Sequence, residues 1–151
     1  MPHKPTRHKV FAYITHQAHL LIFSHPHAPE AGLQVPAGTL ELGETPEAGV
    51  LREAFEETGL TNLSLVSFLG EKQVDMANFG RNEIHHRRFF HLRCNEQPPE
   101  RWRHGELYPS DSTEEPIIFE LWWVPLPHGV PSLIAGHDAF VPQLSPQMGL
   151  A

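Results

Sequence analysis

The stretch from residue 35 to residue 60, VPAGTLELGETPEAGVLREAFEETGL, places a glycine-bearing loop directly before a short, sharply bounded helix. Thr45 is a residue type that caps helix starts, and Pro46 suits the first helical position because the N–H it lacks would be unpaired there. Gly59 readily adopts the left-handed conformation that ends a helix. The sequence therefore predicts a helix over residues 46–58, preceded by a loop that the rest of the fold must hold in place.

This helix has one apolar face and one acidic face. At about 100° per residue, the apolar arc comprises Val50, Leu51, Ala54, Phe55 and Thr58. The opposite arc carries Glu53, Glu56 and Glu57, whose like charges repel one another at this spacing. Arg52 offsets part of that repulsion, and a divalent cation such as Mg²⁺ would offset more. Taken alone, the E-x-x-E-E spacing is more often a solvated face than a metal site.

The wider pattern narrows the interpretation. It consists of Gly38, Glu44, Arg52, Glu53, Ala54, Phe55, Glu56, Glu57, Thr58, Gly59 and Leu60. In identity and spacing it resembles the Nudix box of MutT-like pyrophosphohydrolases. The resemblance implies an α/β (α+β) fold, an α/β/α sandwich with a central mixed β-sheet. It also implies hydrolysis of a diphosphate bond in a nucleoside diphosphate linked to another group, with Mg²⁺, or Mn²⁺ in its place, as cofactor.

The same resemblance implies roles for individual residues of the box. Glu56 and Glu57 would be metal ligands together with the backbone carbonyl of Ala37, where many relatives have glycine. Glu53 would be a further ligand or the general base, and Arg52 would orient the carboxylates. The supporting residues would be Gly38, Glu44, which would brace the loop, and Gly59.

A further acidic residue from the second half of the chain completes the metal site or acts as base in many members of this family. Glu120 is our candidate, because a carboxylate within the otherwise apolar segment IIFELWWVPL needs a partner or a metal. Glu114 and Glu115 are the alternatives. The choice of base among these residues and Glu53 stays open at this point.

Length and composition indicate the number of domains, the class of partner and the cellular environment. The 151 residues suit one domain over residues 1–151, and the net charge of -7 argues against a nucleic-acid partner. The single cysteine, Cys94, is expected to be a buried thiol in a reducing cytoplasm. No segment has the roughly 20 apolar residues of a membrane span, and the first residues do not resemble a signal peptide. A homodimer is one option for assembly.

Hydrophobic patterning predicts a sheet around the box. We expect residues before about Lys9 to be loose, and residues 76–82 to form a turn. Expected strands are residues 10–14 and 19–23 as a hairpin, 34–35, 63–69, 84–94 and 117–126. Expected loops are residues 24–32 and 95–116, and the apolar spacing of residues 132–144 predicts a terminal helix that Gly136 could interrupt.

Basic and aromatic residues outside the box suggest a few contacts. One of Arg87 and Arg88, which face opposite sides of their strand, could meet a substrate phosphate, although a solvated strand end is the commoner role. Trp122 could stack on a base, although core packing is commoner. The twelve histidines complete no zinc motif, and His137 is expected to be a satisfied core or boundary residue.

The sequence predicts an Mg²⁺-dependent hydrolase acting on a small nucleotide: a nucleoside triphosphate, a dinucleoside polyphosphate or a nucleotide sugar. No sequence feature assigns the substrate pocket. Two alternatives are a nucleotide-binding sensor without turnover and a hydrolase of RNA 5′ ends. The retained acidic residues argue against the first and the net charge against the second.

Overall fold

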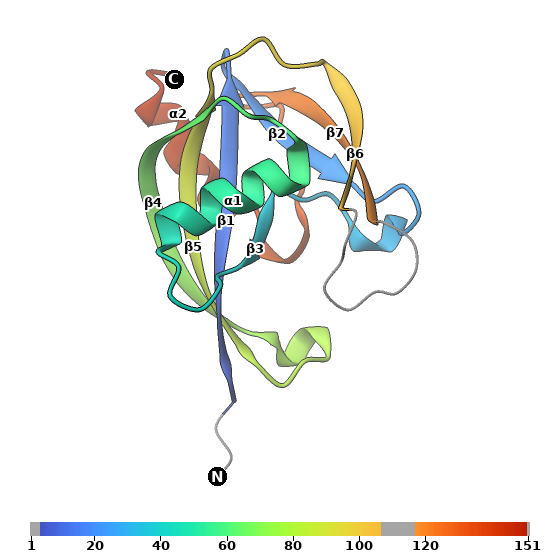
Figure 1. The fold of residues 1–151 in the computed structure, drawn as a ribbon, viewed down its shortest axis with the longest axis vertical. Coiled ribbons are helices and arrows are strands. Elements are labelled where there is room, and N and C mark those ends of the chain that lie inside the picture. The colour runs from blue at the N-terminus through green and yellow to red at the C-terminus, as the bar shows by residue number, and fades with distance from the viewer. Residues whose placement is uncertain (1–3, 107–116, 151) are drawn as a thin grey trace.

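The computed structural model describes residues 4–106 and 117–150 (Figure 1). Its strands are β1 (Thr6–His16), β2 (His19–Ser24), β3 (Ala37–Thr39), β4 (Leu63–Asp75), β5 (Ile84–Cys94), β6 (Arg101–Glu106) and β7 (Ile117–Pro125). The α-helices are α1 (Pro46–Thr58) and α2 (Leu144–Gln147). The strands form one sheet in the order β4-β5-β1-β2-β7-β6, with β3 paired to β1. Because β1 and β5 run parallel and the other pairs antiparallel, the predicted mixed sheet is confirmed.

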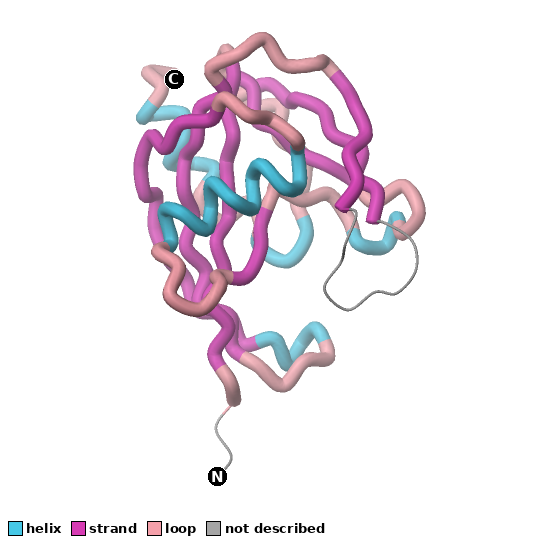
Figure 2. The backbone as a smooth tube through the Cα atoms, viewed as in Figure 1, coloured by secondary structure: helices cyan, strands magenta, loops and turns pink. Residues whose placement is uncertain are grey.

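Apolar side chains bury both faces of this sheet. On one face α1 lies across the strands and packs Val50 and Ala54 onto side chains of β1, β2, β5 and β7. The C-terminal segment lies on the other face (Figures 1 and 2). Its Leu133 and Leu144 pack into the core there. Within the described ranges, no helix is both long and apolar enough to cross a membrane.

Helix α1 has the predicted bounds and caps. The Thr45 side chain accepts a hydrogen bond from the Ala48 N–H, and Gly59 closes the helix with φ of 77°. Its predicted faces need one correction: Phe55 is 51% exposed, whereas Glu57 is 9% exposed. The helix is turned so that Glu57 meets Ala37, the first residue of β3, which leaves Phe55 exposed.

The strands before the helix extend further than predicted. The residues expected to be loose include Thr6 and its neighbours, which instead pair with β5 along the first half of β1. The hairpin of β1 and β2 is confirmed, with Gln17 and Ala18 at positive φ in its turn. Gln34 contributes only an isolated bridge to Phe23, and the regular pairing comes later, at β3.

Most predictions for the segments after the helix are confirmed. Strand β5 has the predicted bounds, and the turn at residues 76–79 is confirmed as a 3-10 helix. Strand β4 begins as predicted at Leu63 but continues to Asp75, past register shifts within residues 65–70. Strand β7 and the burial of Cys94 also agree with prediction.

Two predictions in the second half of the chain are wrong. The expected loop at 95–116 contains β6, an edge strand whose basic residues are compatible with exposure. The expected terminal helix is replaced by 3-10 turns at Ile134–Gly136 and Val141–Gln143, followed by the short α2. Ala135 lies at φ 51° inside the first turn, so a continuous helix cannot form there.

His137 in this C-terminal segment is a satisfied, buried histidine, as predicted. Its Nδ1 accepts a hydrogen bond from the Val35 N–H at 3.2 Å, and its ring meets Phe11 edge to face. Burial, with the nearby Arg87 charge, lowers the pKa of His137 from 6.5 to about 3. The imidazole therefore stays neutral in the folded protein at pH values where it would be charged in the unfolded chain.

We expect His137 to make the protein less stable in mild acid. Between pH 6.5 and 3 the unfolded chain binds a proton at this residue and the folded protein does not, so stability falls as pH falls. At pH 5 this difference lowers the free energy of unfolding by about 1 to 2 kcal/mol. Urea unfolding of wild type and of His137→Asn, which keeps an acceptor for the Val35 N–H, should show a flatter pH dependence in the variant. Identical pH profiles would contradict this assignment.

Candidate active site

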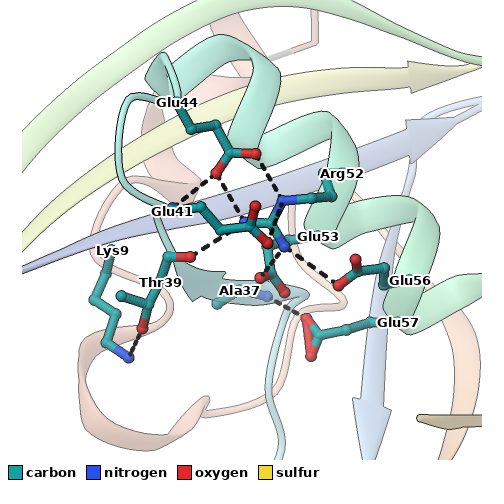
Figure 3. Close-up of polar contacts among 9 residues, drawn as sticks. All are labelled: Lys9, Ala37, Thr39, Glu41, Glu44, Arg52, Glu53, Glu56 and Glu57. Atoms are coloured by element: carbon teal, nitrogen blue, oxygen red, sulfur yellow. Dashed lines mark hydrogen bonds and ion pairs between the residues drawn. The ribbon is translucent and has the colours of Figure 1, made fainter. Parts of the chain in front are cut away.

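Arg52 is the centre of the polar network on α1 (Figure 3). Its guanidinium donates from Nε to Glu44 Oε2 at 2.7 Å and from Nη2 to Glu44 Oε1 at 2.9 Å. Its Nη1 donates to Glu53 Oε1 at 2.7 Å and to Glu56 Oε2 at 3.3 Å. A planar guanidinium suits this arrangement because its N–H groups form a rigid fork. Arg52 therefore holds three carboxylates in a defined arrangement.

Glu44 links this helix to the loop before it. Besides the two bonds from Arg52, its Oε1 accepts the backbone N–H of Glu41 at 3.0 Å. These donors, with Arg52 first, lower the pKa of Glu44 to about 2. The same contacts raise the pKa of Arg52, so both groups stay charged over the physiological range.

Glu53 and Glu57 lie against the short strand β3. A Cβ added at Gly38 would be 2.0 Å from Glu53 Cδ, so only glycine leaves room for that carboxylate. Glu57 Oε1 accepts the backbone N–H of Ala37 at 2.7 Å. Strand β3 and the acidic face of α1 are thus in direct contact, as Figure 3 shows.

The residues present fit a divalent metal ion by charge and by donor type. Four carboxylates lie around the Arg52 guanidinium, those of Glu41, Glu44, Glu53 and Glu56, and a fifth, Glu57, lies next to them on α1 against Ala37. Carboxylate and carbonyl oxygens are the ligands that Mg²⁺ and Mn²⁺ favour. In residues 4–106 and 117–150, no three His, Cys, Asp or Glu side chains already surround one point. The carboxylates are instead turned to Arg52 and to the Ala37 N–H.

A cavity of about 750 Å³ opens at the same loop. Ala37 and Gly38 form part of its wall, so the cavity and the acidic face of α1 meet at these two residues. Its other polar walls come from β1, β5 and the turn after β4, and include Lys9, Arg81, His85 and Arg87. Apolar atoms of Phe11, Met76, Phe79 and Ile134 complete the lining. A cavity of this size accommodates a small ligand.

The comparisons with known proteins agree with this arrangement. The NUDIX domain model matches residues 5–144. The chain belongs to the Nudix family. No curated protein matches it significantly in sequence.

Solved Nudix structures share its fold. A MutT protein from Methanosarcina mazei Go1 is 19% identical, with 98% of this chain and 99% of that chain covered and a TM-score of 0.65. A NUDIX hydrolase from Nitrosomonas europaea is 23% identical, with 82% and 74% covered and a TM-score of 0.59. A UDP-X diphosphatase is 14% identical, with a TM-score of 0.65. The match covers 98% of this chain and 66% of the diphosphatase chain.

The family places this protein among the hydrolases. Nudix hydrolases generally use divalent metal ions and act on small nucleotide substrates. A related structure, a bifunctional NMN adenylyltransferase/ADP ribose pyrophosphatase from Francisella tularensis, contains AMP and a Mn ion.

The structure does not bring Glu120 to the carboxylates of the Nudix helix. Its neighbours on β7, Phe119 and Leu121, pack on the α1 side of the sheet, so Glu120 faces the other side. There it accepts hydrogen bonds from Arg101 and Arg103 on β6, which lower its pKa. The partner that an acidic residue in this strand requires is thus a pair of arginines. The alternatives Glu114 and Glu115 lie outside the described residues.

Sequence reasoning missed contacts that position the Nudix helix. Trp102 Nε1 donates to the Thr58 carbonyl at 2.9 Å, and His104 Nε2 lies 2.9 Å from the Glu56 carbonyl. Both residues belong to β6, within the segment expected to be a loop. The alternation of Arg101, Trp102 and Arg103 was a signal for this strand, since it places the indole on one face and both guanidinium groups on the other.

Proposed function

We propose that this Nudix hydrolase, a single domain over residues 1–151, cleaves a diphosphate bond in a nucleoside diphosphate linked to another group, using Mg²⁺. The supporting observation is the meeting of two features at Ala37 and Gly38: the acidic face of α1 and the cavity of about 750 Å³. A substrate whose remainder occupied the cavity would present its diphosphate to these carboxylates.

The metal ion would be held by Glu53, Glu56, Glu57 and the Ala37 carbonyl. When bound, it would neutralise phosphate oxygens and lower the pKa of a coordinated water. Mn²⁺ prefers similar oxygen ligands and could replace it. Glu44 and Gly59 would act as supports, the first through Arg52 and the second by ending the helix directly after the ligands.

Glu53 is our candidate for the general base. Its Oε1 is held by Arg52 at 2.7 Å, which fixes the carboxylate beside Gly38. A carboxylate held there can accept the proton of a water that attacks phosphorus, while the bridging oxygen leaves with the other phosphate. Arg52 would act as a positioning residue, because its N–H groups are directed at carboxylates.

The proposal is tested by measuring phosphate, pyrophosphate and nucleoside monophosphate formation across a substrate panel. The panel comprises nucleoside triphosphates, dinucleoside polyphosphates, nucleotide sugars including UDP-sugars, ADP-ribose and triphosphorylated RNA, each with Mg²⁺, with Mn²⁺ and with EDTA. We expect turnover of one small-nucleotide class, lost in EDTA and restored by Mg²⁺. Preference for the RNA, or no turnover of any compound by folded protein, would contradict the proposal.

A further inference from the structure

The cavity at Ala37 and Gly38 has a positive lining in a negatively charged protein. The chain carries a net charge of -7, yet the cavity wall includes Lys9, Arg81 and Arg87 against a single acidic residue, Glu30. Arg81 is paired with Glu83 at 3.7 Å, which leaves Lys9 and Arg87 as the cations of the lining without an ion pair in the described residues. His137 also lines it but stays neutral because burial lowers its pKa. A cavity with this lining attracts anions, since low-dielectric walls concentrate the field of the charges that line them.

Arg87 is the most buried cation of this lining, with 3% of its surface exposed. Its Nη1 donates to the Ala135 carbonyl, its Nη2 lies 3.8 Å from Met76 Sδ, and its guanidinium lies over the Phe11 ring at 5.1 Å. Its Nε has no hydrogen-bond partner, and no carboxylate in residues 4–106 and 117–150 forms an ion pair with it. A buried cation without a counter-charge is costly for the fold.

Lys9 lies beside Arg87 and adds a second positive charge. The two residues are register partners on the parallel strands β1 and β5, so their side chains project from the same face of the sheet. Lys9 Nζ donates to Thr39 Oγ1 at 2.6 Å, a neutral acceptor, and burial lowers the pKa of this lysine. The charges of Glu83 and Glu53 oppose part of that shift, but no carboxylate in the described residues forms an ion pair with Lys9 or Arg87. Two such cations on one face of the sheet are expected where an anionic ligand binds.

We propose that Arg87 and Lys9 form an anion subsite that binds a phosphoryl group of the substrate, separate from the metal ligands of α1. The N–H groups of Arg87 match phosphate oxygens because a guanidinium can donate to two of them at once. The inference rests on the proposed function, since it assigns the part of the substrate that lies in the cavity. It also decides between Arg87 and Arg88: Arg88 projects from the other face of β5, beside His8.

The test measures binding in EDTA, where neither metal nor turnover contributes. Isothermal titration calorimetry with inorganic pyrophosphate, AMP, adenosine 3′,5′-bisphosphate and adenosine compares wild type with Arg87→Met and with Arg88→Met as matched control on the same strand. We expect the phosphorylated probes to bind wild type and adenosine to bind at least about tenfold more weakly. Arg87→Met should weaken the phosphorylated probes by at least about tenfold, since a charge-assisted pair contributes about 1.5 to 3 kcal/mol, and Arg88→Met by less than about twofold.

The probes also locate the phosphoryl group within the substrate. Tighter binding of adenosine 3′,5′-bisphosphate than of AMP would support the subsite and place the group beyond the diphosphate, whereas equal affinity would support it within the diphosphate chain. Wild-type affinity in folded Arg87→Met, or adenosine bound as tightly as its phosphates, would overturn the proposal. If Arg87→Met does not fold, Lys9→Met, at a half-buried position, decides by the same criteria. Because these measurements need no catalysis, failure of the hydrolase proposal would be recognised separately, by the absence of turnover.

Discussion

Replacing Glu57 by Gln is expected to reduce turnover by roughly 10³-fold or more while the protein keeps its fold. Glutamine preserves the acceptor for the Ala37 N–H, now bonded at 2.7 Å, but removes a negative charge from the face proposed to hold the metal ion. Loss of one preorganised electrostatic contact commonly costs 10²–10³-fold, and loss of a charged metal ligand should cost at least as much. Initial rates with the preferred substrate at several Mg²⁺ concentrations measure the effect.

Glu41→Gln is the matched control for this variant. It removes the same charge from a side chain that is 67% exposed and 3.6 Å from Arg52 Nε. We expect less than about threefold loss, because an exposed ion pair at this distance contributes little. Equal losses in the two variants would show that total charge, rather than a ligand at Glu57, controls the rate. Undiminished activity of Glu57→Gln would remove Glu57 from the metal site.

Gly38→Ala is expected to reduce turnover by about 10²-fold with a small change in stability. The added Cβ would be 2.0 Å from Glu53 Cδ, so the carboxylate must move from its place beside the loop. Displacement of a catalytic group by about 1 Å can cost 10²-fold in rate. Gly38 is not at positive φ, and the clash involves the far end of a flexible side chain, so the melting temperature should fall by only a few degrees.

A double-variant cycle tests whether Gly38→Ala acts through Glu53. In a Glu53→Gln background, where the proposed base is already disabled, adding Gly38→Ala should reduce the remaining rate by less than about threefold. Contacting residues that act as a unit show this non-additivity. Full additivity of the two losses would contradict our account and indicate that Gly38→Ala disturbs the loop independently of Glu53.

The helix α1 was predictable because its signals are local. Thr45 and Gly59 specify its ends through their own backbone and side-chain chemistry, and both act as expected. The rotation of the helix about its axis was less predictable. The Glu57 contact with the Ala37 N–H brings an acidic side chain into the buried part of the helix surface and leaves Phe55 exposed.

The sheet was predictable where alternation was strong. In β5, Arg87 and Arg88 face opposite sides as expected, and the residues that alternate on the Arg87 face, His85, Arg87, Phe89 and His91, are all buried. Strand β6 was missed because it is short and lies in a proline-rich segment, with prolines at 98, 99 and 109, a composition typical of a loop. The predicted role of Glu120 at the metal site was wrong for the same reason. Its partners, Arg101 and Arg103, belong to β6. Because β6 was not predicted, a metal ion was the remaining partner for a carboxylate at this position.

The sequence by itself determined the bounds of α1, because Thr45 and Gly59 act locally. It also indicated the family and the mixed-sheet fold, through the resemblance of residues 38–60 to the Nudix box. Tertiary structure alone decided which distant groups share a site. Parallel pairing of β1 with β5 brings Lys9 to Arg87, and the packing of α1 on β3 places Glu53 and Glu57 against Gly38 and Ala37. These contacts join segments far apart in the chain, so they depend on strand register and helix rotation, which local propensities do not specify.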